Sequence, residues 1–312
     1  MLSFFTRPNF PNAAIGIEKD RVTAVALDRE SRGRFAVKQA ASIEVPHGLI
    51  EPSFTGRNIA DPRQFRVVLE EAATVAGMLN QRAWSVSLPS NAARTAILTV
   101  DSVASGKAES EEILDWKAEQ TFGAPAAELR ISRRKITGEG DGRSRYFATA
   151  VKLSVIDEYE TIFEELGWKA GLILPRAVSE TKWLLNENAN ADSLLVSIQD
   201  DGFTALLLHD GEPNVVRTVS CSPQERDDEI YRLLMFYHDR FGSGDAAGSL
   251  EKFLVVGRDL VPAKITEISA EALGRPLSIL RPDDVGLNMP AGTGLRFEDL
   301  AAPAGLASLG WR

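Results

Sequence analysis

The chain has 312 residues, of which 44% are apolar and 25% charged, and its formal net charge is −9. This length allows two domains with cores of their own, and the composition is that of an ordinary globular protein. The acidic balance argues against a nucleic-acid partner, because it does nothing to offset repulsion by phosphates. The densest basic cluster is interpreted as a solvated strand face and consists of Arg130, Arg133, Arg134 and Lys135.

Cys221 is the single cysteine, which excludes an intramolecular disulfide and favours a reducing compartment. The apolar run near the N-terminus is too short for a signal peptide, and no stretch reaches the ~18 apolar residues that span a bilayer. We therefore expect a cytoplasmic protein that is peripheral to a membrane only through a partner.

Two eleven-residue stretches, 17–27 and 198–208, align without gaps and share five identical positions. Each reads as an apolar strand, a polar turn and a second strand, which predicts a β-hairpin. A third strand is expected after each hairpin, over 35–45 and 213–219. The spacing of about 180 residues far exceeds solenoid repeats, so a duplicated domain is predicted. Chance similarity between short apolar strands is the alternative.

The segment between the hairpins begins with a helix and a strand that belong to the α/β pattern, and an inserted subdomain follows them. The helix is expected to begin at Asp61-Pro62, an N-cap residue followed by proline, and the strand covers 83–88. An inserted ββαβ-like subdomain is then predicted over 93–167. It should contain a strand at 94–100, a helix from Ser110 to Phe122, a hairpin around the glycine-rich turn 138–142 and a helix at 154–167.

The remaining elements return to an α/β pattern. A capping box at Ser222–Glu225 predicts the start of a helix. The other expected elements are a strand at 172–174, a helix at 177–185, strands at 253–256 and 276–280, a helix from about 262 and a last helix at 300–309.

No familiar catalytic constellation is present. The three histidines, His47, His209 and His238, have no metal-ligand spacing with cysteine or carboxylates. The sequence has no nucleophile elbow, P-loop or dinucleotide fingerprint. We predict that the protein is not an enzyme and holds no metal.

An ordered set of short motifs carries a resemblance that covers nearly the whole chain. They are Ile15-Gly16-Ile17, Leu88-Pro89-Ser90, residues 113–120, residues 148–170, the hairpin at Leu195, Val255-Val256-Gly257 and residues 305–312. The chain resembles the PilM family of type IV pilus assembly proteins, which are actin-like and related to FtsA. The cytoplasmic domain of GspL is the nearest relative.

The resemblance implies an α/β, actin-like (ribonuclease H-like) duplicated two-lobe fold with an FtsA-like small subdomain inserted in the first lobe. The first lobe would comprise residues 1–92, 168–190 and 300–312. The inserted subdomain would cover 93–167, and the second lobe 191–299.

The resemblance also implies a nucleotide cleft in which an Asp-x-Gly turn of each hairpin holds phosphate. Glycine lets backbone N–H groups point at phosphate oxygens, and aspartate positions the metal or its water. This chain departs from that pattern at the positions Glu18, Lys19, Asp20, Ser197, Gln199 and Arg258, while Gly257 is retained. Glu18 and Ser197 replace the aspartates, and Gln199 replaces a glycine. We expect a degenerate cleft without cofactor; weak ATP–magnesium binding through Lys19 or Arg21 stays open.

The leading hypothesis is an adaptor of the pilus alignment complex. The resemblance implies that it binds the N-terminal cytoplasmic peptide of a PilN-like inner-membrane protein, in a groove between the first lobe and its inserted subdomain. Candidate contacts are Trp116, Gln120 and Phe122, although helix packing is the favoured explanation for Phe122. The alternatives are an ATP-binding actin-like protein whose nucleotide state regulates polymerisation or motor coupling, and a subunit of a related secretion system.

Overall fold

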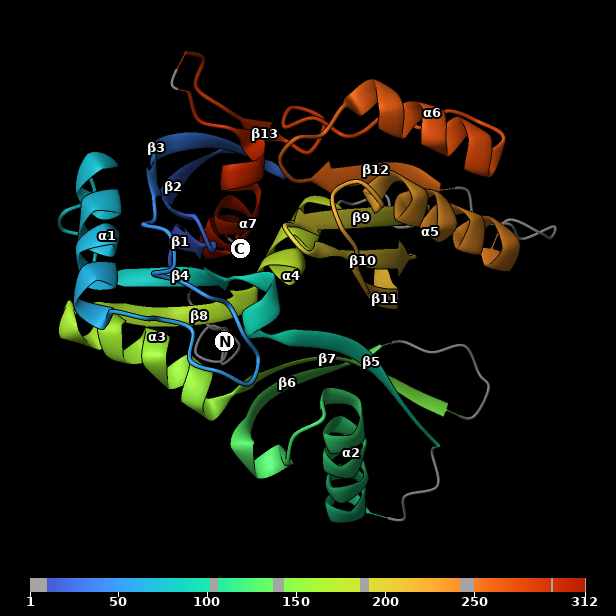
Figure 1. The fold of residues 1–312 in the computed structure, drawn as a ribbon, viewed down its shortest axis with the longest axis horizontal. Helices are drawn as coiled ribbons and strands as arrows, with labels where there is room; N and C mark the ends of the chain where they lie inside the picture. The colour runs from blue at the N-terminus through green and yellow to red at the C-terminus, as the bar shows by residue number, and fades with distance from the viewer. Residues whose placement is uncertain are drawn as a thin grey trace, which may run out of the picture. The chain divides into compact units, whose positions relative to one another are not determined.

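A computed structural model describes residues 10–101, 106–136, 143–185, 191–241, 250–292 and 294–311 (Figure 1). The chain divides into two compact units. The first comprises Met1–Ala92, Ser154–Lys182 and Gly286–Arg312, and the second Ala93–Leu153 and Trp183–Val285. The predicted glycine-rich turn at 138–142 lies outside the described residues.

The first unit is built on a six-stranded sheet with the order β13-β3-β2-β1-β4-β8. Strands β1, β2 and β3 form an antiparallel meander, whereas β4 and β8 continue the sheet in parallel. The strands are β1 (Ala13–Ile17), β2 (Arg21–Ser31), β3 (Arg34–Glu44), β4 (Ala83–Leu88), β8 (Lys169–Pro175) and β13 (Leu287–Asn288).

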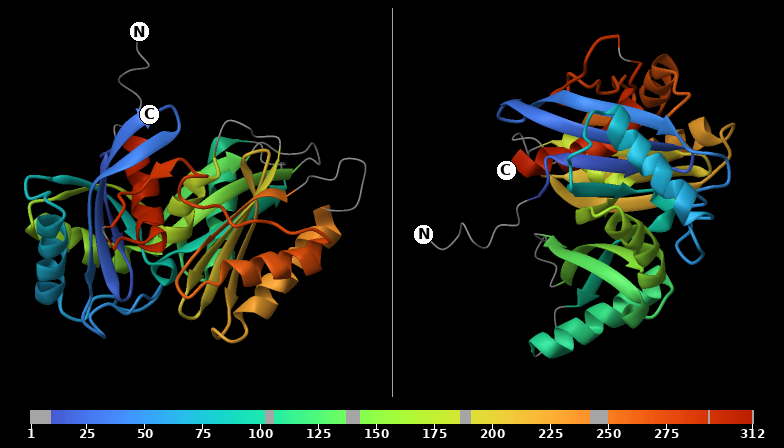
Figure 2. Two further views of the ribbon diagram at one scale, coloured as in Figure 1. Left: turned by 90° about the horizontal axis from the view of Figure 1, so that it is seen from above. Right: turned by 90° about the vertical axis from the view of Figure 1, so that its left-hand side faces the viewer.

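Helices cover both faces of this sheet. Helices α1 and α7 lie on opposite faces (Figure 2), and α3 packs beside α1 through a ring contact between Phe65 and Tyr159. On the other face α7 packs against β1, so tightly that a Cβ atom on Gly16 would lie 2.9 Å from the ring of Pro303. The helices are α1 (Pro62–Val75), α3 (Leu153–Glu165), α4 (Arg176–Glu180) and α7 (Phe297–Ala307), with 3₁₀ turns at Ser90–Ala92, Thr181–Trp183 and Ser308–Trp311.

The second unit contains two sheets. A four-stranded sheet has the order β11-β10-β9-β12, and α5 and α6 complete its apolar core. A separate three-stranded sheet, β5-β7-β6, carries α2. The strands are β5 (Arg94–Asp101), β6 (Leu129–Ile136), β7 (Arg143–Lys152), β9 (Asp192–Gln199), β10 (Gly202–His209), β11 (Glu212–Ser220) and β12 (Leu250–Val256). The helices are α2 (Lys107–Phe122), α5 (Arg226–Phe241) and α6 (Pro262–Leu273), with a 3₁₀ turn at Ala126–Glu128.

The two predicted hairpins have the same pairing register. Ile17 pairs with Val22 in the first hairpin, and Ile198 with Phe203 in the second. Each first strand also has a parallel neighbour at an equivalent position, since Ile15 pairs with Val86 and Val196 with Val255. The gap-free alignment therefore matches residues that are equivalent in space within their own sheets.

The unit boundaries differ from those expected. Helix α3, expected in the insertion, belongs to the first unit, because Tyr159 is buried there and the Glu158 carboxylate accepts backbone N–H groups of Asn58 and Ile59 at 3.0 Å. The three-stranded sheet groups with the second unit, where Arg145 donates to the carbonyl oxygen of Asn214 at 2.6 Å. Residues 286–299, expected in the second lobe, also lie in the first unit.

Several local predictions are confirmed, and others are wrong. Asp61 caps α1 by accepting the backbone N–H groups of Arg63 and Gln64. Helix α2 starts one turn before Ser110, whose hydroxyl donates to the Gly106 carbonyl instead of capping. The strand expected at 276–280 is a single bridge between Phe253 and Ile279, and the helix expected at 177–185 is one short helix and a 3₁₀ turn.

The hydrogen bonds of the predicted capping box at Ser222–Glu225 are present, but the helix does not begin where the box predicted. The Glu225 carboxylate accepts both the backbone N–H and the hydroxyl of Ser222, at 3.0 and 2.8 Å. The helix itself begins only at Arg226. The box therefore closes the turn that leads into α5.

Candidate functional site

The first hairpin turn closes on its own backbone. The N–H of Glu18 donates to the carbonyl oxygen of Arg21 at 2.8 Å, and Val45 donates to the Asp20 carbonyl at 2.8 Å. The Lys19 ammonium lies 2.9 Å from the carboxylate of Glu51. The polar groups expected to face a phosphate are thus engaged with neighbours in the same unit.

The Glu18 carboxylate is held by a buried guanidinium. Nη1 of Arg176 lies 2.7 Å from Glu18 Oε2, and Nε of Arg176 lies 2.8 Å from Glu180 Oε1. Glu180 is fully buried, and the Arg176 side chain is 8% exposed. Burial by itself lowers the pKa of Arg176, but the charges of Glu18 and Glu180 outweigh it and raise the pKa above its ordinary value.

Glu18, Arg176 and Glu180 form a Glu–Arg–Glu triad, which is the main electrostatic feature at the first turn. Helix α4 starts with Arg176 directly after β8 ends at Pro175, and Glu18 follows the end of β1. Because β1, β4 and β8 run parallel in one sheet, their carboxyl ends meet at the same edge. A carboxylate already shared with a guanidinium is a poor ligand for a metal–phosphate complex.

The second hairpin places its candidate residues at the end of β9. Ser197 is buried and pairs with Thr204, two residues before the turn, whereas Gln199 pairs with Gly202 at the turn. By register, Gln199 and not Ser197 is the counterpart of Glu18. Gly202 has φ = 143°, and a Cβ atom there would lie 1.9 Å from the carbonyl oxygen of Val219. This turn therefore requires glycine for its own geometry.

Gly257 has a packing role in the same unit. It follows β12, and a Cβ atom on it would lie 2.5 Å from the Cβ atom of Ile198. Arg258 comes next and is partly buried. The structure thus brings Ser197, Gln199 and Gly257 to one edge of the four-stranded sheet, and close strand packing accounts for the glycine.

The three residues predicted to contact a peptide lie on different faces of α2. Phe122 is 1% exposed and packs under the helix, so helix packing accounts for it, as favoured from the sequence. Trp116 is 59% exposed, and Gln120, one turn later, is also exposed. Trp116 and Gln120 therefore share an outward face of the helix.

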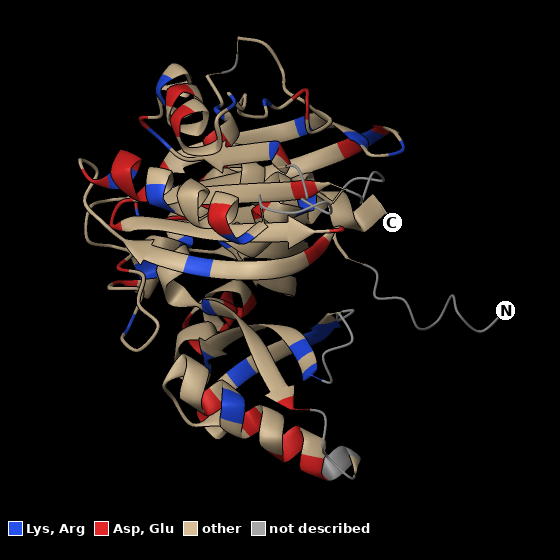
Figure 3. Cartoon of the chain, turned by 90° about the vertical axis from the view of Figure 1, so that its right-hand side faces the viewer, with Lys and Arg blue, Asp and Glu red and all other residues tan. Residues whose placement is uncertain are grey.

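Charge is distributed unevenly around that face. Acidic residues lie along α2 and basic residues on the neighbouring strands (Figure 3). Arg133, expected on a solvated strand face, instead forms an ion pair with Asp115 of α2 and is only 19% exposed. Arg134 forms an ion pair with Glu212 on β11. Arg133 and Arg134 of the basic cluster are therefore engaged within the second unit, whereas Arg130 and Lys135 are exposed.

The described residues contain no group of three potential metal ligands. Among the same residues, no helix is long and apolar enough to cross a membrane.

The duplicated hairpins, each flanked by a parallel strand, and the helices packed on the sheets define an actin-like α/β fold of two lobes, as predicted. The chain is similar to a structure of the PilM–PilN type IV pilus biogenesis complex, with a TM-score of 0.75 and 17% identity, over 98% of this chain and 100% of that one. The fold implied by the PilM resemblance is confirmed.

Two further structures match less well. A Bacteroides thetaiotaomicron protein with an actin-like ATPase fold has a TM-score of 0.49 and 10% identity, over 96% of this chain and 98% of that one. The cytoplasmic domain of EpsL, from the type II secretion system of Vibrio cholerae, has a TM-score of 0.46 and 10% identity, over 96% and 93%. No protein-family model matches the sequence, and no curated protein does.

Sequence reasoning missed the partner of Glu18. Arg176 is 158 positions away in the chain, and no local pattern connects the two residues. The only available signal was an arginine placed directly after an apolar strand that ends in proline.

Proposed function

We propose that this chain is an adaptor of a type IV pilus assembly complex, and that it binds the N-terminal cytoplasmic segment of a PilN-like inner-membrane protein. The observation that carries the proposal is the full-length similarity to the chain in the PilM–PilN complex. The protein then works in the cytoplasm, at the inner membrane, and reaches that membrane through its partner.

The proposed contact surface includes the outward face of α2. An exposed tryptophan is costly to leave in water and is the residue type most often found at the energetic centre of an interface. Trp116 and the exposed Gln120 offer an apolar surface and an amide for backbone hydrogen bonds. Phe122 contributes by holding the helix on its sheet.

We further propose that the protein does not hydrolyse ATP and has lost its nucleotide site. The loss of the nucleotide site is supported by the backbone and the charges of the first hairpin turn. The turn after β1 has no glycine, its Glu18 N–H is used within the hairpin, and its carboxylate is shared with Arg176. Phosphate binding needs free backbone N–H groups and a metal ligand at this place.

The test is a pulldown with the immobilised N-terminal segment of a PilN-like protein from the same cell. The wild-type chain is expected to bind, and Trp116→Ala should weaken binding about tenfold or more, as for a central interface tryptophan. Val261→Ala is the matched control, because Val261 is 62% exposed and lies outside α2. Equal binding by both variants would remove Trp116 from the interface, and failure of the wild-type chain would overturn the adaptor proposal.

The competing function, a nucleotide-regulated actin-like protein, makes the opposite prediction at the first turn. Thermal-shift measurements with ATP and magnesium should show no stabilisation at micromolar nucleotide. Glu18→Asp should not create binding, because the turn backbone is closed in either case. Micromolar binding by the wild-type chain would favour the nucleotide-regulated function.

A further inference from the structure

Strand β3 has an open edge in the first unit. Strand β2 pairs with it along its whole length, from Arg34 to Glu44. On its other side β13 pairs only with Phe35 and Ala36. Beyond Ala36, the described residues provide no second neighbour for β3.

The open edge presents unused backbone groups. Val45 donates its N–H to the Asp20 carbonyl at 2.8 Å, toward the β2 side. Hydrogen-bonding direction alternates along a strand, so the N–H and C=O groups of Glu44, Ser42 and Ala40 point away from β2. Such a row is a template for another extended chain.

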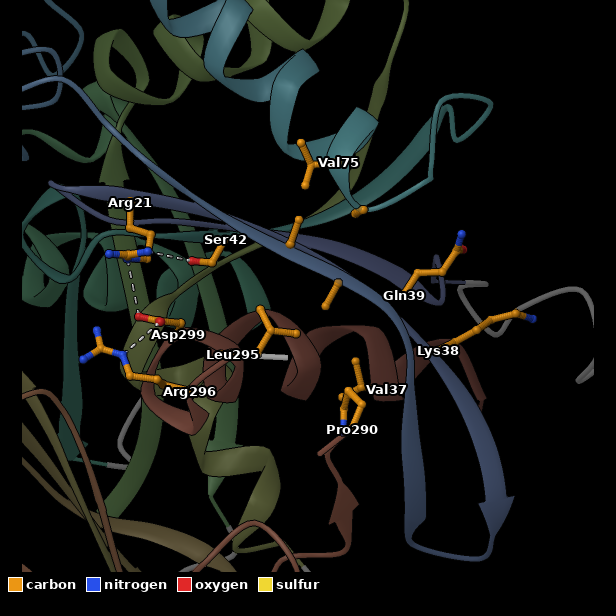
Figure 4. A pocket seen from close by; sticks show the side chains of 14 residues that line it. Arg21, Val37, Lys38, Gln39, Ser42, Val75, Pro290, Leu295, Arg296 and Asp299 are labelled. Atoms are coloured by element: carbon orange, nitrogen blue, oxygen red, sulfur yellow. Dashed lines mark hydrogen bonds and ion pairs between the residues drawn. The ribbon is translucent and has the colours of Figure 1, made fainter. Parts of the chain in front are cut away.

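A groove of about 770 Å³ follows this edge. It is lined by residues 37–42 of β3, by Val75 and Ala76 at the end of α1, and by residues of the segment that leads into α7. Val75 lies on one side of β3, and Leu295 and Pro290 lie on the other (Figure 4). The groove is thus bordered on both faces of β3, by the end of α1 and by the segment before α7.

The lining of the groove consists of small apolar side chains, together with polar and charged ones. Its apolar members are Val37, Ala40, Ala41, Val75, Ala76, Pro290 and Leu295, and they suit small apolar side chains. Its charged members are three cations, Arg21, Lys38 and Arg296, and one acid, Asp299. The lining itself therefore holds more cations than acids, although Asp28, Glu44 and Glu298, outside the lining, each pair with one of the cations.

Each cation of the groove already has an acidic partner, since Lys38 pairs with Asp28 and Arg296 also pairs with Glu298, so an incoming carboxylate would share or replace such a partner. Arg21 and Arg296 lie at one end of the groove and share Asp299, which is 5% exposed (Figure 4). The second partner of Arg21 is Glu44, whose side chain is 85% exposed and lies outside the lining. The Glu44 end of this pair is open to solvent, where an ion pair contributes little, although the Arg21 side chain is only 18% exposed.

We propose that the groove beside β3 binds an extended segment of a partner protein, which adds a strand to the open edge. The segment has small apolar residues at alternate positions and an acidic residue at the end next to Arg21 and Arg296. This binding surface belongs to the first unit. It is distinct from the outward face of α2 in the second unit, so it stands independently of the proposed pilus function.

The probe is a labelled seven-residue capped peptide that alternates valine and serine and carries one aspartate at an end. Its matched control has lysine in place of aspartate. Fluorescence anisotropy with the full chain should show saturable binding of the acidic peptide, and about 5- to 10-fold weaker binding of the lysine peptide. Arg296→Glu should reverse this preference, while Lys264→Glu, at a similarly exposed site outside the groove, should leave it unchanged.

Strand addition is tested separately by Ala40→Pro, which removes an outward N–H without removing a β2 hydrogen bond. It should abolish binding, and hydrogen exchange of the β3 amides should slow with peptide only in the wild-type chain. If Ala40→Pro unfolds the protein, hydrogen exchange of the β3 amides in the wild-type chain, with and without peptide, tests strand addition instead. Absence of binding at millimolar peptide, or binding with unchanged β3 exchange, overturns the proposal. So does sedimentation showing that the edge is occupied by a second copy.

Discussion

The carboxylate of Glu18 and the guanidinium of Arg176 lie 2.7 Å apart, although 158 positions separate them in the chain. The same guanidinium bonds the fully buried Glu180. This triad ties the first hairpin turn to the start of α4. The Glu18 carboxylate therefore has a structural role at the turn where the sequence resemblance placed a phosphate site.

Arg176→Met should therefore destabilise the protein strongly. The substitution removes the cation that Glu18 and Glu180 share, a loss of about 3–5 kcal/mol in the free energy of unfolding. Urea denaturation measures it. Arg66→Met is the matched control, because its pair with Glu165 is 39% and 50% exposed and should contribute less than about 1 kcal/mol. Equal losses in the two variants would contradict this account of the triad.

Gly202→Ala tests the second turn. The backbone at φ = 143° disfavours alanine by about 1–3 kcal/mol, and the new methyl group would also meet the Val219 carbonyl. Thermal unfolding should show a clear loss of stability. Gly106→Ala is the control, since nothing lies within 4 Å of its added Cβ and its φ is −161°. A neutral Gly202→Ala would mean that the hairpin register differs from the one described.

A buried carboxylate also joins several elements of the second unit. Asp192 is 1% exposed, accepts the Tyr237 hydroxyl at 2.7 Å and lies 2.6 Å from Nδ1 of His209. Burial, together with the hydrogen bond and charge of Asp192, raises the pKa of Tyr237 above its usual range. The tyrosine therefore stays protonated as a donor.

Tyr237→Phe should lower the free energy of unfolding by about 1.5–3 kcal/mol, because a hydrogen bond to a charged acceptor is lost. Guanidinium denaturation at neutral pH measures it. Tyr231→Phe in the same helix is the control, since no hydrogen bond of its hydroxyl is found among the described residues. A loss confined to Tyr231→Phe would contradict the assigned role of Asp192.

The Ser222–Glu225 box makes a pH-dependent prediction. Hydrogen bonds from the Ser222 hydroxyl and N–H lower the pKa of Glu225 below its ordinary 4.5. A lowered folded-state pKa gives stability that is present above about pH 4.5 and is lost as pH falls through the folded-state pKa. Ser222→Ala should therefore raise the pKa of Glu225, as followed by NMR titration. The stability difference from wild type should shrink from pH 7 to pH 3, and an unchanged difference would argue against the box.

The duplicated architecture could be predicted from the sequence because strand signals are local. The stretches 17–27 and 198–208 carry matching apolar patterns, and their pairing registers turned out to be equivalent. The cap at Asp61 was predictable for the same reason. Other elements depend on tertiary contacts, which the local sequence does not reveal. Residues 276–280 read as a strand, but Pro276 and Pro282 flank a segment that forms a single bridge with β12.

The candidate site was only partly predictable. The absence of glycine at the first turn is visible in the sequence. The engagement of Glu18 by Arg176 is not, because it depends on the sheet, in which β4 lies between β1 and β8. The two compact units also divide the chain at other positions than the expected domains do. Helix α3 was expected in the insertion, but Tyr159 packs on Phe65 in the first unit. Replacing residues 94–152 by a short loop would therefore remove the three-stranded sheet and α2 without removing α3 from the first unit.

The most direct test of the adaptor account is calorimetric titration of the PilN-like N-terminal segment into the nucleotide-free chain, repeated with ATP and magnesium. The account predicts saturable binding with the same dissociation constant in both titrations. Binding that appears, or tightens tenfold or more, only when ATP is present would contradict it.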